Sequence, residues 1–119
     1  MTATTLALLT ALAFAEAPKA TDGPTSLEAK RWLMPRGFFK AAWCIHTHES
    51  VDFHISNPPY GNGFQFMLST WVRAGGNPAW WITASPREQF YRAWRIWKQD
   101  GYSWREWSTA GACGLALAS

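Results

Sequence analysis

The sequence predicts a small, single, mainly helical domain, and three observations support this prediction. The chain has 119 residues, a length typical of one domain. Its stretches without Gly or Pro carry apolar side chains at helical spacing, and no section shows the alternation of a series of strands. Hydrophobic residues make up 48% and charged residues 16%, a balance that excludes an intrinsically disordered chain.

Residues 1–15 are expected to be a secretory signal peptide. An apolar run from Thr4 ends in Ala13-Phe14-Ala15, the small-x-small pattern that signal peptidase accepts. No Lys or Arg precedes this run, so an ordinary apolar helix is the alternative. We expect no membrane span, because the run is too short to cross a bilayer as a helix.

Residues 16–36 have the prolines and weak periodicity of a linker, with at most a short helix near residues 27–33. The folded domain is therefore expected at residues 37–119. Its first helix is predicted over residues 38–49, which carry apolar side chains without a breaker.

Residues 52–63 contain two Pro, two Gly and two Asn, a composition that predicts a loop or a short irregular hairpin. A second short helix is predicted over residues 64–74 from its apolar spacing. The third has the clearest start, Ser85-Pro86-Arg87-Glu88, where the Ser and Glu side chains would each bond one free backbone N–H. Gly101 is expected to end it.

Glu49 is the residue most expected to carry chemistry. It ends an otherwise apolar and aromatic helix, directly before a loop that would form the wall of a cleft. Aromatic surroundings disfavour a charged carboxylate, and a general acid needs the proton that the neutral form holds. The alternative is an ordinary Glu at a helix end in water.

Several short motifs stand in a recognisable order around Glu49. They are Trp43-Cys44-Ile45, His48-Glu49-Ser50, Gly61-Asn62-Gly63-Phe64-Gln65-Phe66-Met67, Ser69-Thr70-Trp71, Gly75-Gly76, Ala84-Ser85 and Glu88-Gln89. In this order the chain resembles the transglycosylase-like domains of the lysozyme superfamily, most closely the resuscitation-promoting-factor type, over residues 39–113.

The resemblance implies an α+β lysozyme-like fold with a sugar-binding cleft. Glu49 matches the single catalytic glutamate, the general acid that protonates the glycosidic oxygen between N-acetylmuramic acid and N-acetylglucosamine. Gln65 and Phe66 match the block that lines the cleft, and Thr70 and Trp71 match the pair after it. Two departures, Leu68 in place of a proline and residues 54–59 in place of a glycine-rich stretch, bear on substrate preference.

Rings in or beside loops are candidates for stacking on sugars, and Tyr60 and Trp71 are the better ones. A second carboxylate is typical of glycosidases, and Asp52 is the nearest candidate, although capping the next turn is the role we favour for it. In lytic transglycosylases the muramic acid's 6-hydroxyl attacks instead, and one acid/base residue suffices. Hydrolysis and cyclisation both remain open.

Cys44 and Cys113 are expected to pair with each other in an exported chain, which the resemblance also implies. No metal site is expected, because His46 and His48 stand two residues apart and a helix directs such side chains to different faces. No cofactor is expected either.

The expected function is a secreted, cell-wall-associated glycosidase or lytic transglycosylase, monomeric, acting on the glycan strands of peptidoglycan. The resemblance implies a cell-wall peptidase as a possible partner. A non-catalytic module that binds glycan or signals through it is the alternative. A nucleic-acid partner is not expected, because the net charge of +3 forms no basic stripe.

Overall fold

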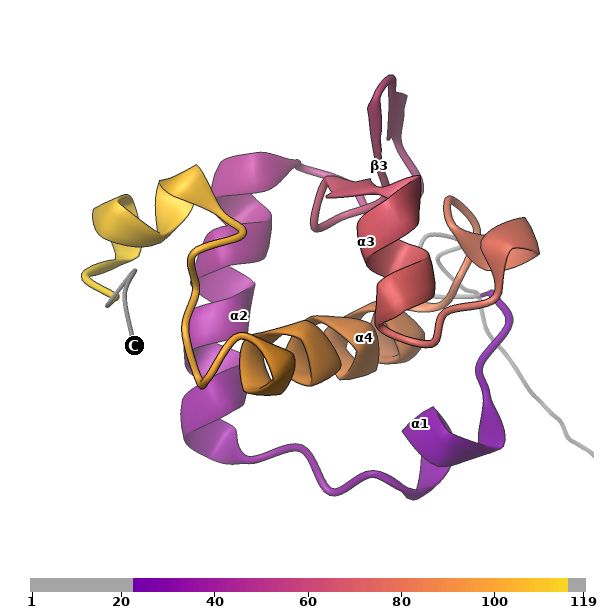
Figure 1. Cartoon of the computed structure of the whole chain (residues 1–119), viewed down its shortest axis with the longest axis horizontal. Helices are drawn as coiled ribbons and strands as arrows, with labels where there is room; N and C mark the ends of the chain where they lie inside the picture. Colours follow the sequence, from indigo (N-terminus) through magenta and orange to yellow (C-terminus); the bar gives the residue numbers. More distant parts are fainter. Residues whose placement is uncertain (1–22, 116–119) are drawn as a thin grey trace, which may run out of the picture.

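Two 14-residue helices, α2 (Arg36–Glu49) and α4 (Pro86–Gln99), form the frame of the fold and run across one another in Figure 1. The computed structural model of the chain describes residues 23–115. The predicted signal peptide lies outside these residues. No helix between residues 23 and 115 combines the length and the apolar character needed to cross a bilayer.

Helix α4 begins where the capping motif predicts, but only half of the predicted capping box forms. The Ser85 hydroxyl accepts a hydrogen bond from the backbone N–H of Glu88. The Glu88 side chain does not return to Ser85; its carboxylate is fully buried and accepts bonds from the Ser26 backbone N–H and from Arg92. The Ser85 N–H donates to the Pro24 carbonyl instead. A tertiary contact has replaced the local one.

The segment before residue 37 is packed where the structure describes it. Helix α1 (Leu27–Arg31) is capped by the Ser26 hydroxyl, and Ala29 and Trp32 are buried. The Arg87 side chain of α4 donates hydrogen bonds to the carbonyls of Ala29 and Trp32. The short helix is as expected, but residues 23–36 belong to the folded body rather than to a linker. The long-range contacts that dock them leave no periodic signal in the sequence.

A small antiparallel sheet lies between α2 and α3 in the chain. It has the order β2 (Ser56–Asn57), β3 (Tyr60–Gly61) and β4 (Phe66–Met67), with Ser56 paired to Gly61 and Tyr60 to Met67. The first two strands form the hairpin expected between residues 52 and 63.

The second predicted helix is shorter than expected, because α3 spans only Leu68–Arg73. Asn62 and Gln65 have positive φ values of 63° and 51°, a backbone that cannot continue a right-handed helix. Phe64 and Phe66 are both buried at a spacing of two, which is the spacing of a strand. The five apolar residues among residues 64–71 fit helical and strand spacing alike, and the structure places Phe66 and Met67 in a strand.

The core is rich in aromatic rings. Its largest fully buried apolar side chains are Trp71, Phe64, Ile45 and Ile96. Trp32, Trp104 and Trp107 are also buried, so several of the chain's nine Trp residues fill the core. The short helix η2 (Pro78–Trp80) follows α3 and precedes α4.

The predicted disulfide between Cys44 and Cys113 is present. It joins α2 to η3 (Ser108–Cys113), which lies beside the upper part of α2 in Figure 1. The C-terminal part of the described chain is thereby fixed next to the helix that ends at Glu49.

Candidate functional site

Three adjoining hollows form a groove between the end of α2, the sheet and the segment before η3. Gln65 lines all three, which makes the groove continuous. The central hollow has a volume of about 340 Å³ and is lined by Glu49, Asn57, Tyr60, Gln65, Glu106, Trp107 and Ser108. One end, of about 300 Å³, also contains Glu49, and the other, of about 160 Å³, contains Phe66, Met67 and Thr70.

Glu49 is the last residue of α2 and lies half-buried at the groove. The helix ends there because Ser50 takes an extended backbone, while its N–H still bonds the His46 carbonyl over 2.8 Å. The Thr109 hydroxyl donates a 2.7 Å hydrogen bond to Oε2 of Glu49. A partly buried carboxylate held in this way can exchange a proton with a bound molecule.

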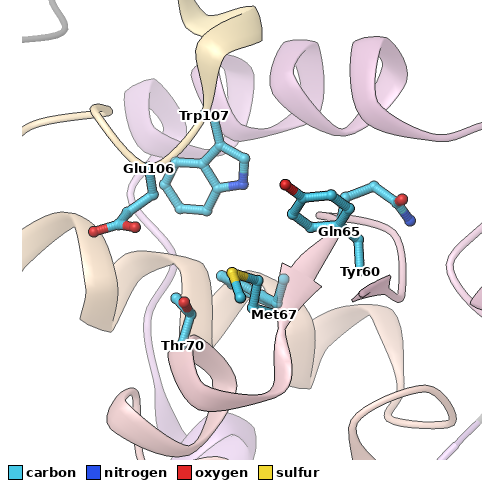
Figure 2. Close-up of a pocket in the computed structure, with 7 residues that line it drawn as sticks. Tyr60, Gln65, Met67, Thr70, Glu106 and Trp107 are labelled. Atoms are coloured by element: carbon cyan, nitrogen blue, oxygen red, sulfur yellow. The ribbon is translucent and has the colours of Figure 1, made fainter. Parts of the chain in front are cut away.

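The Gln65 side chain is hydrogen-bonded at both ends of its amide. Its Nε2 donates to the Asn62 carbonyl over 2.8 Å, and its Oε1 accepts from the Asn57 side chain over 3.1 Å. The amide therefore braces the turn and strand β2, and Gln65 also lines the groove. Tyr60 lies opposite Glu106 across the hollow shown in Figure 2, and its side chain is 44% exposed.

Phe66 and Thr70 line the small end of the groove. Phe66 is almost fully buried, so it forms the floor of this hollow. In Figure 2 the Thr70 side chain lies below Trp107 and beside Met67.

The position of Trp71 corrects the prediction that its ring lines the cleft. The side chain is 0% exposed, and its indole N–H donates to the Asn77 carbonyl over 2.7 Å. Successive helical residues differ by about 100° in direction, so Trp71 points into the core when Thr70 faces the groove. A sugar cannot stack on this ring in the described structure.

Asp52 also lies away from the groove. Its Oδ1 accepts hydrogen bonds from the backbone N–H groups of Phe53 and His54, and its side chain is exposed. The turn-capping role is therefore observed. Of the carboxylates in the described part of the chain, only Glu49 and Glu106 line the three hollows.

Glu106 and Trp107 are site residues that the sequence reasoning missed. The Trp107 indole N–H donates to the Phe64 carbonyl over 2.9 Å, which fixes the ring against the sheet. Glu106 accepts a 2.9 Å bond from Arg73. Burial, together with the nearby Asp100 carboxylate, raises the pKa of Glu106, while Arg73 opposes the shift. Neither residue belongs to a motif, and only the folded chain brings them to Glu49.

The histidines near Glu49 have structural surroundings. His46 is buried, its Nδ1–H donates to the Gly63 carbonyl over 2.7 Å, and its ring stacks on Phe53. His48 lies near both sulfurs of the disulfide, so Cys44, His48 and Cys113 form a cluster of possible metal ligands. The two sulfurs are bonded to each other and are not thiolates, the form that binds metals.

Comparison with known proteins finds no matching family model. No curated protein and no solved structure matches the chain significantly.

Proposed function

We propose that this chain is an exported glycosidase or lytic transglycosylase that cuts the β-1,4 bond between N-acetylmuramic acid and N-acetylglucosamine in peptidoglycan. The observation that carries this function is Glu49, a half-buried carboxylate on a groove that also presents the Gln65 amide and the Tyr60 phenol. A lysozyme-like architecture with a sugar cleft is part of the same proposal. The disulfide agrees with export, because such bonds persist in oxidising compartments.

The groove has the polarity that a glycan strand requires. Amide groups of Asn57 and Gln65 and the hydroxyl of Tyr60 can bond the hydroxyls and N-acetyl groups of sugars. The flat apolar faces of Tyr60 and Trp107 suit the C–H faces of pyranose rings. The three hollows follow one another, as the sugars of a strand would.

In the proposed reaction, protonated Glu49 gives its proton to the glycosidic oxygen as the bond from that oxygen to the anomeric carbon breaks. The anomeric carbon then bonds to the oxygen of water or of the muramic acid's own 6-hydroxyl. The proton that this oxygen loses restores the acid. Thr109 is expected to position the carboxylate through its bond to Oε2.

A glycan-binding or signalling module without turnover is the second candidate. It is favoured by the bonds that already occupy Oε2 of Glu49 and both ends of the Gln65 amide. Such a module would use the same groove but would not need an exchangeable proton.

Mass spectrometry of the soluble products from purified peptidoglycan separates the two. We expect the wild-type protein to release muropeptides and Glu49→Gln to release none while still pulling down with the polymer. Asp52→Asn is the matched control, because Asp52 is a nearby carboxylate outside the three hollows. An active Glu49→Gln variant would remove Glu49 from catalysis, and retention without products from any variant would favour the binding module.

A further inference from the structure

Two carboxylates reach the central hollow from different ends of the groove. Glu49 lines the central hollow and the end that contains Ser50 and Asn57. Glu106 lines the central hollow and the opposite end, which contains Thr70. Figure 2, which draws the small end of the groove, shows Glu106 beside Trp107 and across from Tyr60 and Gln65. A sugar bound in the central hollow would therefore have a carboxylate toward each end.

Glu106 is held by charged neighbours. Arg73 donates a 2.9 Å bond to its Oε2 and also reaches Oδ1 of the buried Asp100. Arg105 bonds the same Asp100 oxygen over 3.3 Å. The side chain of Glu106 is 28% exposed, so water can reach it from the groove. The Arg73 bond restricts the Glu106 carboxylate and leaves it partly exposed.

We propose that Glu106 is the second carboxylate of the reaction and the base that activates an attacking water molecule. This role for Glu106 rests on the proposed function and deepens it. Water gives one proton to Glu106 while its oxygen bonds to the anomeric carbon, the bond to the glycosidic oxygen breaks, and that oxygen takes the proton of Glu49. The products are two shorter strands, one with a new reducing end. The protein is therefore a hydrolase rather than an anhydro-forming transglycosylase.

The chemistry of this pair matches what glycosidases that use water require. They place a carboxylic acid on one side of the glycosidic bond and a carboxylate on the other, with room for a water molecule between the carboxylate and the sugar. Asp52, the other candidate, lies outside the three hollows and caps a turn. The surroundings of Glu106 raise its pKa, which makes its carboxylate a stronger base, while Arg73 favours the ionised form that a base needs.

Digestion of purified peptidoglycan in ¹⁸O-labelled water tests this role directly. We expect reducing ends that each carry one ¹⁸O atom. Products with 1,6-anhydro ends and no label would overturn the role of Glu106 and leave the proposed cleavage intact. The absence of products from the wild-type protein would remove both.

Variants of Glu106 provide a second test of this role. Glu106→Gln is expected to lower the cleavage rate by about 10²- to 10⁴-fold, the usual contribution of a general base. Arg105→Gln is the matched control, because Arg105 bonds Asp100 of the same ion network and does not bond Glu106. The cleavage rate of this variant should stay close to that of the wild type. Added azide, a nucleophile that has no proton to lose, should restore cleavage by Glu106→Ala and yield a glycosyl azide. Wild-type rates for Glu106→Gln, or no azide product from a folded Glu106→Ala, would contradict the assignment.

Discussion

The Thr109 hydroxyl donates a 2.7 Å hydrogen bond to Oε2 of Glu49, joining two residues 60 positions apart. Glu49 ends α2, and Thr109 lies in η3, which the disulfide fixes to the same helix. The carboxylate at the groove is therefore held by the C-terminal part of the described chain. Changes in η3 should reach the reaction through this contact.

Replacing Thr109 by Val removes the hydroxyl at nearly constant volume. A hydrogen bond to a charged group contributes about 1.5–3 kcal/mol, so the cleavage rate should fall by roughly 10- to 100-fold. We expect kcat to fall and KM to change little, because Thr109 does not line the three hollows. Thr109→Ser keeps the hydroxyl and should restore most of the rate. Equal losses in both variants would mean that packing, not the bond, matters.

Removal of the disulfide should affect stability and activity together. The bond closes a chain segment of 69 residues, and opening such a loop lowers the free energy of unfolding by about 4 kcal/mol. Urea unfolding of the Cys44→Ser, Cys113→Ser double variant measures this loss. Cleavage should also fall, because η3 carries Thr109. Full activity of the folded double variant would show that η3 stays in place without the bond.

Local signals explain how much of the fold was predictable. The long periodic helices and the Ser85 cap depend on neighbouring residues, and both are observed close to where they were expected. The docking of α1 depends on Arg87 and on other residues of α4 far along the chain, which no local pattern records. The sequence predicts that residues 64–67 are helical, but the positive φ values of Asn62 and Gln65, both non-glycine residues, prevent a helix there.

The groove was predictable only in part for the same reason. Glu49 was identifiable as a carboxylate at the end of an apolar helix, and the structure places it on the groove. The prediction for Trp71 was wrong, because tertiary packing decides which face of α3 points inward. Glu106 was missed, because tertiary packing also brings it to the groove. Motif spacing gives no information on either.

The buried ion pair between Arg92 and Glu88 should be essential for stability. Their 2.7 Å bond lies in the core, with side chains 3% and 0% exposed. Arg92→Met leaves the Glu88 charge buried without its cation, which should lower the free energy of unfolding by about 3–5 kcal/mol. The double variant with Glu88→Gln should recover part of this loss. Glu28→Gln removes the exposed partner of Arg92, at 57% exposure, and should cost less than about 1 kcal/mol.

Stability should fall as the pH drops below about 6.5 because of His46. Burial lowers the pKa of His46 from its ordinary value of 6.5, outweighing the bond to the Gly63 carbonyl and the Asp52 charge. Between the two pKa values the unfolded chain binds a proton that the folded chain does not, so unfolding becomes more favourable. Above pH 6.5 this contribution to stability is fully present. The free energy of unfolding is measured with urea between pH 5 and 8. It should change less with pH in His46→Gln than in the wild-type protein, and an equal change in both would show that His46 is not the cause.

Trp71 and Tyr60 should separate stability from sugar binding. Trp71→Phe loses the bond to the Asn77 carbonyl and part of a fully buried ring, so it should destabilise the fold by about 1–3 kcal/mol. Tyr60→Ala removes an exposed ring from the central hollow and should weaken binding of an N-acetylglucosamine oligomer about tenfold, with a smaller effect on stability. Calorimetric titration in the Glu49→Gln background measures binding without turnover. Weaker binding by a folded Trp71→Phe variant, with Tyr60→Ala unchanged, would mean that the sugar lies elsewhere than in this groove.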